Sequence, residues 1–252
     1  MDSNQSELRF YKIDPFADNT ELLQRISEIL NEGGSHNASR FSKDIWQWQY
    51  NLLPGRDARI YVSAYENKIT GYYHVPVYSG MVDGKESRFA MVQDVAVSSS
   101  MRGKGVFRKL AEYATNDLIQ SDVALLYTFP NKKSIHTFLK YNDYSIVSLM
   151  DTYILPVNFT NIIKSKIKLP LIPWVAGKIL NAAFSLTNKN LPYSLKIIEM
   201  DINDELVEAH FMNFNKQFPI HIKRDKAYLN WRFVQKPGAK HYCFALMNDK
   251  TK

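Results

Sequence analysis

Residues 95–107 combine the residue types that bind phosphate groups. The stretch begins apolar, turns polar at Ser98–Ser100, and continues as Arg102-Gly103-Lys104-Gly105 into a sequence that suits a helix. The first backbone N–H groups of a helix have no partner within it, and the helix dipole adds partial positive charge there. Glycine lets the backbone approach a ligand closely, and the arginine and lysine add full charges. A helix that begins here is therefore suited to hold a pyrophosphate.

The loop alone also fits a plain connection between a strand and a helix, in which the two cations are merely solvated. Two other phosphate-binding motifs are excluded. Gly-Lys-Ser and Gly-Lys-Thr, which mark a P-loop, do not occur, and neither does the Gly-x-Gly-x-x-Gly fingerprint of dinucleotide-binding domains.

The elements around the loop include both helices and strands. Apolar residues at helical spacing predict a helix over Val106–Ile119, and an apolar run predicts a buried strand over Val123–Thr128. Asp83-Gly84 predicts a hairpin turn, and Pro76 indicates an edge or a bulge in its strand. We expect further helices over 19–30, 42–51 and 132–140, and further strands over 8–13, 60–65, 69–78, 88–97, 144–147 and 150–155. This order predicts an α+β fold with a central mixed sheet.

The order of these elements and two motifs resemble the GNAT superfamily of acyl-CoA-dependent N-acetyltransferases. The family's pyrophosphate loop has the pattern Arg/Gln-x-x-Gly-x-Gly/Ala, and residues 102–107 fit it except at Phe107, which replaces a small residue. Asn131-x-x-Ser134 and residues 138–144 look like a later motif of the family, with an inserted residue and without the usual glycine. The resemblance covers residues 8–155. It implies a GNAT-like, mostly antiparallel central sheet flanked by helices.

The resemblance also implies acetyl-CoA (coenzyme A) as the cofactor, with direct attack of a neutral amine on its thioester in a ternary complex. Backbone groups of the strand before the loop would pair with the pantetheine arm like an added strand, and amides of the loop would take the pyrophosphate. Those strand residues equally suit sheet core, and both roles can hold at once. The implied cofactor-binding residues are Val95, Ala96, Val97, Arg102, Gly103, Lys104, Gly105, Val106, Phe107, Asn131 and Ser134.

The residues that correspond to the family's general base and general acid are less clear from the sequence. Asp94 follows Gln93 at a strand position where many GNAT enzymes have a glutamate, so it can accept the proton of the attacking ammonium, directly or through water. Alternatively, it is a solvated strand residue or a turn anchor. Where the family often has a tyrosine that protonates the thiolate, this chain has Phe138 or Leu139, which cannot donate a proton. Tyr141 is the candidate acid, with amphipathic packing as the alternative.

We predict N-acetyl transfer to the primary amine of a small molecule, an amino sugar being one option. The alternatives are a non-catalytic acyl-CoA-binding module, a protein-lysine acetyltransferase and a basic nucleic-acid-binding protein. The net charge of +7 fits nucleic acid, but the basic residues are spread along the chain without a binding motif, so we expect no such partner. Several residues before the loop can line an acceptor cleft for sugar rings or apolar amines, or form core: Trp46, Trp48, Tyr50, Tyr72, Tyr73, His74 and Tyr78.

Composition narrows the class and the location. One cysteine, Cys243, excludes an internal disulfide framework and fits a reducing compartment, so we expect a cytoplasmic protein whose cysteine lies in the core. Six histidines without metal-ligand spacing indicate no metal site. The polar N-terminus does not resemble a signal peptide. The basic and apolar residues 164–186 contain two prolines, and they suit a helix between domains or peripheral membrane contact, not a stable span.

A short pattern occurs twice in the chain. Trp48 and Trp231 stand at the same distance before a Pro-Gly pair, and an aromatic residue follows each at the same spacing. We expect a GNAT-like acyl-CoA-binding domain over 1–156, a helical connector over 157–192, and a C-terminal α/β segment over 193–252 that begins a second GNAT-like unit. That unit either docks on the first domain or belongs to a longer tandem protein. Coincidence is the third explanation.

Overall fold

The computed structural model of the protein describes residues 7–17, 20–32, 42–132, 134–151, 153, 178–180 and 195–248. The chain divides into two compact units. The first comprises Met1–Ser145 and Met200–Cys243, and the second comprises Ile146–Glu199 and Phe244–Lys252. The main described feature of the second unit is a two-stranded sheet of β6 (Leu195–Met200) and β8 (Cys243–Asn248).

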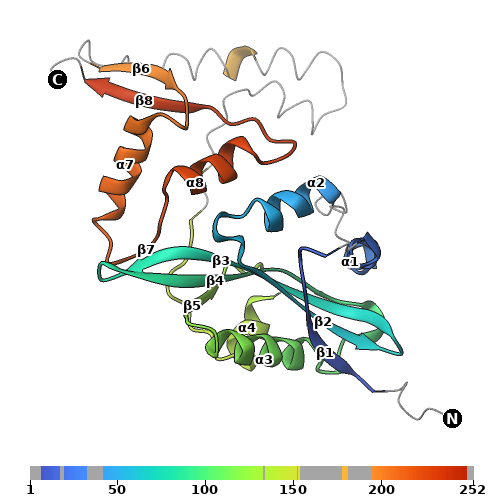
Figure 1. Ribbon diagram of the computed structural model, residues 1–252. Helices are drawn as coiled ribbons and strands as arrows, with labels where there is room; N and C mark the ends of the chain where they lie inside the picture. Colours follow the sequence, from blue (N-terminus) through green and yellow to red (C-terminus); the bar gives the residue numbers. More distant parts are fainter. Residues whose placement is uncertain are drawn as a thin grey trace. The chain divides into compact units, whose positions relative to one another are not determined.

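The first unit is built on a six-stranded sheet (Figure 1). Five strands follow the order β1-β2-β3-β4-β5, and β7 pairs with the end of β3 that β2 does not reach. All neighbours are antiparallel except β4 and β5, which run parallel. The α+β fold with a mostly antiparallel sheet is therefore confirmed. The strands are β1 (Arg9–Ile13), β2 (Ala58–Tyr65), β3 (Lys68–Val82), β4 (Lys85–Val97), β5 (Val123–Thr128) and β7 (Ile220–Ile222).

Helices cover both faces of this sheet (Figure 1). Alternate strand residues point to opposite faces. Tyr73 packs with Leu110 of α3 (Val106–Ile119) on one side, which we call the α3 face. Tyr72 packs with Ile26 of α1 (Thr20–Glu32) on the other, which we call the α1 face. The remaining helices of the unit are α2 (Lys43–Trp46), α4 (Ile135–Tyr141), α7 (Glu205–Asn215) and α8 (Lys226–Leu229).

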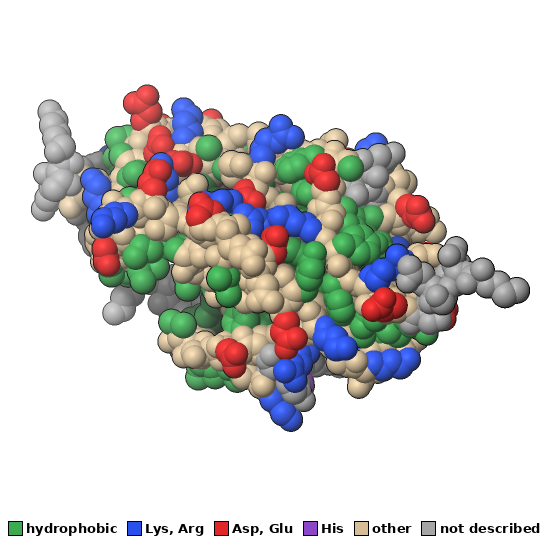
Figure 2. All heavy atoms as spheres, turned by 60° about the horizontal axis from the view of Figure 1, so that its bottom comes forward, with side chains coloured by type: hydrophobic (Ala, Val, Ile, Leu, Met, Phe, Trp, Pro, Cys, Tyr) green, Lys and Arg blue, Asp and Glu red, His purple; other side chains and the backbone are tan. Residues whose placement is uncertain are grey.

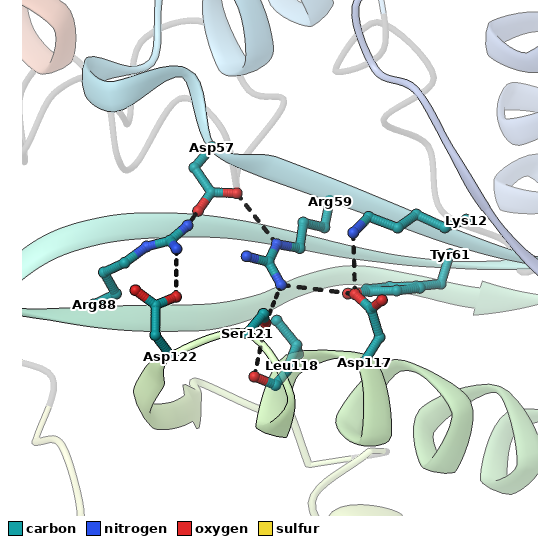
Figure 3. A network of polar contacts seen from close by, with 9 residues as sticks. All are labelled: Lys12, Asp57, Arg59, Tyr61, Arg88, Asp117, Leu118, Ser121 and Asp122. Atoms are coloured by element: carbon teal, nitrogen blue, oxygen red, sulfur yellow. Dashed lines mark hydrogen bonds and ion pairs between the residues drawn. The ribbon is translucent and has the colours of Figure 1, made fainter.

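A polar network ties the C-terminal end of α3 to β2 (Figure 3). The buried guanidinium of Arg59 donates to Ser121 Oγ, and its Nε lies 3.2 Å from Asp57 Oδ1. Asp117 of α3 accepts a 2.6 Å hydrogen bond from the Tyr61 hydroxyl and lies 3.6 Å from the Arg59 guanidinium. Burial raises the pKa of Asp117, but the hydrogen bonds from Tyr61 and a lysine outweigh it and leave the pKa below its ordinary value. The network fixes the far end of the helix that follows the predicted loop.

Three details differ from the expected elements. The helix expected over 42–51 divides into α2 and a π-helical turn at Gln47–Asn51, where the Leu52 amide donates to the Gln47 carbonyl at 3.1 Å. Residues 144–147 and 150–151, where we expected parts of two strands, form none and pair with no described strand, and residues 152, 154 and 155 of the second expected strand lie outside the described part. Pro76 lies in a central strand, at the last residue that β2 pairs, and not at an edge.

Residues 42–55 and 225–238 form the same motif twice. Ser42 and Asp225 cap α2 and α8, and each accepts a hydrogen bond from the amide three residues later. Each short helix then passes into a π-helical turn, the second one at Asn230–Val234. Each copy ends on a Pro-Gly glycine with positive φ. The repeated sequence pattern therefore corresponds to a repeated structure within the first unit.

Trp48 and Trp231 join the two copies. Their buried rings stack with centroids 4.9 Å apart. The Trp48 Nε1 donates to the Trp231 carbonyl at 2.7 Å, and the Trp231 Nε1 donates to the Trp48 carbonyl at 2.8 Å. This contact holds residues 225–238 against the core of the α1 face.

Candidate active site

The predicted phosphate-binding loop lies between β4 and α3. Gly103 and Gly105 have φ values of +76° and +73°, and a Cβ on either would meet nothing within 4 Å. Backbone conformation therefore requires the glycines, and the space beside them is open to a ligand. The Lys109 amide donates to the Gly105 carbonyl at 3.1 Å, in the first turn of the helix. The amides of residues 106–108 precede this bond and point out of the helix end.

The charged side chains of the loop are exposed, whereas its aromatic side chain packs inward. Arg102 and Lys104 are exposed. Phe107 turns into the core of the α3 face, with its ring centroid 5.5 Å from that of Phe138 and 6.3 Å from that of Tyr73. Phe107 replaces the small last residue of the family's loop pattern. Its side chain therefore packs into the core and does not obstruct the loop. Amides, two cations and open glycines together fit a pyrophosphate.

β4 has an open backbone edge directly before the loop. Its pairing with β5 ends at Val92, whose carbonyl accepts a 3.0 Å hydrogen bond from Thr128 Oγ1. The described residues of β5 pair with none of residues 93–97, while β3 still pairs with this stretch on its other side. The backbone of Val95–Val97 can therefore take an extended ligand as an added strand.

Asn131 and Ser134 lie together at the start of α4. The Ser134 amide donates to Asn131 Oδ1 at 3.0 Å, and the Ile135 amide donates to the Asn131 carbonyl at 3.0 Å. The two residues therefore shape the first turn of α4, a local role that the sequence did not reveal. Their contact with a cofactor stays a prediction.

Asp94 lies in a β-bulge of β4. The register between β3 and β4 shifts here, and Asp94 has a φ of +48°, which is uncommon outside glycine and occurs at bulges. Its Oδ2 lies 3.7 Å from Nδ1 of His74, and the same nitrogen lies 3.4 Å from Nε2 of Gln93. Burial lowers the pKa of His74 although the carboxylate opposes this, so the imidazole is neutral at pH 7. The Asp94 carboxylate can therefore act as a proton acceptor beside a neutral ring.

The α3 face contains a phenol that the sequence analysis missed. Phe138, one of the two residues that we align with the family's tyrosine, is buried and packs edge-on against Tyr144, with centroids 5.1 Å apart. The Tyr144 hydroxyl lies 3.5 Å from that of Tyr73, and burial raises the pKa of Tyr144 to about 12. Tyr141 is the last residue of α4, and its side chain lies outside the part that the structure describes. Tyr144 belongs to the later GNAT-like motif at residues 138–144. That motif could have indicated it as a candidate acid.

On the α1 face, a cavity of about 530 Å³ lies beside Asp94. Of the seven residues predicted to line an acceptor cleft, Trp48 and Tyr78 lie in its wall, and the other five are buried outside it. The sequence missed further aromatic residues because they come from β5 and from the chain after β7. These are Tyr127, Phe129, Tyr228 and Trp231.

The charged side chains of the cavity come from two distant parts of the chain. Asp94 belongs to β4, whereas Arg224, Arg232 and Lys236 follow β7. The Arg232 guanidinium lies 6.0 Å from the ring centroid of Trp48, and the Lys236 ammonium lies 5.5 Å from it. No local pattern identified these cations, because the pairing of β7 with β3 and the packing of residues 225–238 bring them to the site.

The loop and the cavity belong to opposite faces of the sheet. The helix that begins at the loop packs on the α3 face, whereas the aromatic wall of the cavity belongs to the core of the α1 face. Asp94 lies in the stretch of β4 that is open toward β5, and it also lines the cavity. A phosphate-binding side and an acceptor side therefore flank Asp94.

The comparison of sequences decides the family. Residues 19–147 match the family described as "Acetyltransferase (GNAT) domain". The chain belongs to the GNAT acetyltransferase family. This confirms the resemblance drawn from the loop at residues 102–107, and it makes the protein an N-acetyltransferase by family. GNAT acetyltransferases use acetyl-CoA. A second GNAT unit is not confirmed.

Several solved structures are similar to this chain. A conserved protein from Enterococcus faecalis V583, described as a probable N-acyltransferase, matches 97% of the chain with 12% identity and a TM-score of 0.61, and the match covers 53% of that protein. Glucosamine-6-phosphate N-acetyltransferase from Arabidopsis thaliana matches 59% of the chain and 99% of its own length (14% identity, TM-score 0.45). A predicted acetyltransferase with acetyl-CoA from Clostridium acetobutylicum matches 58% and 96% (14% identity, TM-score 0.47). No curated protein sequence matches the chain.

Further observations concern the other predictions for this GNAT protein. None of its described helices is long and apolar enough to cross a membrane, and residues 164–186 lie outside the described part except for 178–180. The described residues contain no group of three His, Cys, Asp or Glu side chains that could hold a metal ion.

Cys243 is free and only half-buried, so it is not the core residue that we expected. Where the α3 side comes forward, basic and acidic side chains are interspersed (Figure 2).

Proposed function

We propose that this GNAT protein transfers an acetyl group from acetyl-CoA to the primary amine of a small molecule, in a ternary complex. The position of Asp94 carries the proposal. It lines the cavity on the α1 face and lies in the open stretch of β4 just before the phosphate-binding loop. A cavity of about 530 Å³ has the size of a small-molecule site.

Acetyl-CoA fits the α3 side of the site. The amides at the N-terminus of α3 and two exposed cations suit the pyrophosphate, and the open edge of β4 suits the pantetheine arm. When bound, acetyl-CoA supplies the acetyl group as a thioester, whose carbon–sulfur bond breaks as the acceptor nitrogen bonds to the acetyl carbon. The residues proposed to hold it are Val95, Ala96, Val97, Arg102, Gly103, Lys104, Gly105, Val106, Phe107, Asn131 and Ser134.

Asp94 is the proposed general base. Its side chain is 15% exposed and lines the cavity, so the ammonium group of an acceptor can transfer its proton there, directly or through one water. The neighbouring His74 is neutral and therefore does not offset the negative charge. Deprotonation frees the nitrogen lone pair for attack.

A phenol on the α3 face is the proposed general acid. Tyr144, with a pKa of about 12, keeps its proton at pH 7 and can give it to the thiolate sulfur. Tyr141 is the second candidate for this role. Because a free thiol has a pKa of about 8.5, the thiolate is a fair leaving group even without an acid.

We propose a cytoplasmic protein whose partner is a small molecule and not a nucleic acid. Its one cysteine is free, which agrees with a reducing compartment. The interspersed charges of the α3 side, in contrast to a continuous basic surface, agree with a small-molecule partner.

Calorimetric titration with acetyl-CoA tests the cofactor site. Gly105→Glu adds a carboxylate and a strained Cβ to the loop, so we expect it to abolish binding. Gly84→Glu is the matched control, because Gly84 has a φ of +78° and open space in the β3–β4 hairpin. It should bind acetyl-CoA as the wild type does.

Failure of the folded wild type to bind acetyl-CoA would overturn the proposal, as would equal binding by Gly105→Glu. Release of free thiol in the presence of a panel of amines then tests the transfer itself. Binding without turnover on any amine would point instead to a non-catalytic acyl-CoA-binding module.

A further inference from the structure

We propose that the acceptor amine also carries an acidic group, a carboxylate or a phosphate, and that Arg224, Arg232 and Lys236 bind this group. This substrate class concerns the same cavity and so rests on the proposed function. Among the described residues that line the cavity, Asp94 is the one carboxylate, against these three cations. The two arginines among these cations favour a ligand that brings negative charge with it.

The two arginines of the cavity have no carboxylate partner in the described part of the chain. Arg224 and Arg232 are exposed, and neither forms an ion pair with a carboxylate of the described ranges. The adjacent Lys223 behaves differently, because its Nζ lies 3.0 Å from Glu86 Oε1, outside the cavity. Two guanidinium groups that pair with no described carboxylate are well suited to bind the oxygen atoms of a carboxylate or a phosphate.

Packing fixes the chain that carries these cations. The amide of Lys223, directly before Arg224, donates to the Ser79 carbonyl of β3 at 3.0 Å. Arg232 directly follows Trp231, whose indole is stacked and hydrogen-bonded to Trp48. The second copy of the repeated motif thus supplies Arg232 and Lys236, Arg224 directly precedes it, and the first copy supplies part of the cavity wall.

Tyr78 lies in the cavity wall, where charges of both signs act on it. Burial raises its pKa most, Tyr127 and Tyr228 raise it further, Arg232 lowers it, and Asp94 raises it by a smaller amount, so both charges act on this hydroxyl group. An acceptor with an ammonium at one end and an acidic group at the other would be drawn to Asp94 and to the cations at once. This orients the amine toward the open edge of β4. A polycationic amine would instead meet the three cations and be repelled.

Acetylation of matched amines tests the proposal. We would measure kcat/KM from thiol release with glucosamine 6-phosphate against glucosamine, with an amino acid against its amide, and with a polyamine. The wild type should prefer the acidic member of at least one pair by 10-fold or more and turn over the polyamine poorly. The phosphate pair and the carboxylate pair distinguish the two acidic groups.

Removal of the cations should remove the preference. The variant Arg224→Ala/Arg232→Ala/Lys236→Ala should lose the 10-fold selectivity and keep its affinity for acetyl-CoA. Its control is Lys216→Ala/Lys226→Ala/Lys240→Ala, which removes the same charge from nearby positions outside the cavity and should keep the selectivity. Quenching of tryptophan fluorescence during titration with the same amines gives a binding readout that does not need turnover.

Three results would overturn the proposal while acetyl-CoA still binds. These are equal kcat/KM and affinity within both pairs, a preference for the polyamine, or unchanged selectivity in the cavity variant. Loss of acetyl-CoA binding by the wild type would instead contradict the proposed function itself, so the two failures are distinguishable.

Discussion

Trp48 and Trp231 occupy equivalent positions in two copies of one motif, and each indole N–H donates to the backbone carbonyl of the other residue. The exchange satisfies two buried donors and two carbonyls at a single contact. It also fixes the segment that carries the cavity's arginines. The contact therefore serves the geometry of the acceptor site as well as the stability of the fold.

Phenylalanine at either tryptophan position should destabilise the protein. Trp48→Phe and Trp231→Phe each remove a donor from a buried carbonyl, so each should lower the free energy of unfolding by about 1–3 kcal/mol. The two substitutions should be non-additive, with a coupling of about 0.5 kcal/mol or more, because they break one shared contact. Urea denaturation of both single variants and the double variant measures this coupling. Trp48→Phe combined with Phe138→Leu, on the opposite face, should be additive, and a zero coupling between the tryptophans would contradict the expectation.

Loss of the Asp94 carboxylate should slow transfer without weakening cofactor binding. We expect Asp94→Asn to lower kcat by about 10²- to 10⁴-fold, as for loss of a general base, and to leave the Kd for acetyl-CoA unchanged. Asp83→Asn is the matched control, because Asp83 has a similar φ of +49° in a hairpin away from the site. Steady-state kinetics with calorimetry separates the two effects. An unchanged kcat would remove Asp94 from the chemistry.

The buried His74 should make stability depend on pH. Burial lowers the folded-state pKa of His74 below that of the unfolded chain, about 6.5. Below that pH the unfolded chain takes up a proton that the folded protein does not, so stability falls as the pH falls from about 7 toward 5. His74→Gln should flatten this slope in urea midpoints measured across the range. His136→Gln, at an exposed position, should leave the slope unchanged, and equal slopes in all three proteins would refute the assignment.

Tyr144→Phe should lower kcat in a manner that depends on pH. At pH 7 we expect a loss of about 10-fold or more, because the sulfur leaves without a proton donor. Above about pH 8.5 the loss should shrink, because the thiolate is then stable without a proton. The pH profile of kcat for Tyr144→Phe and Tyr141→Phe measures this. A loss confined to Tyr141→Phe would transfer the role to that residue, and no loss in either would contradict phenol catalysis.

The features that were predictable from the sequence are local. The loop at residues 102–107 and the turn at Asp83-Gly84 depend on glycines whose positive φ few other residues adopt. Asp94 was identified as a residue, but its bulge was not, because a shift in register depends on the neighbouring strand. Residues 144–147 have the composition of a strand, yet composition does not provide a neighbouring strand to pair with.

The acceptor side depended on tertiary structure. Arg224, Arg232 and Lys236 reach the cavity because β7 pairs with β3 and residues 225–238 pack on the α1 face. The repeated tryptophan pattern was visible in the sequence, but the contact between its two copies was not. Pattern reasoning within one segment identifies elements and local motifs, whereas a cavity wall assembled from β4, β5 and residues 220–238 requires the packed chain.

The contact between the repeats has the symmetry that two identical subunits would show, in which one residue touches its counterpart and is touched in the same way. Here both partners belong to a single polypeptide. Their effective concentration is set by the connecting chain and not by how much protein is present, so the contact does not dissociate on dilution. An acceptor cavity whose wall includes both repeats therefore stays complete in a monomer, even at the low protein concentrations of an enzyme assay.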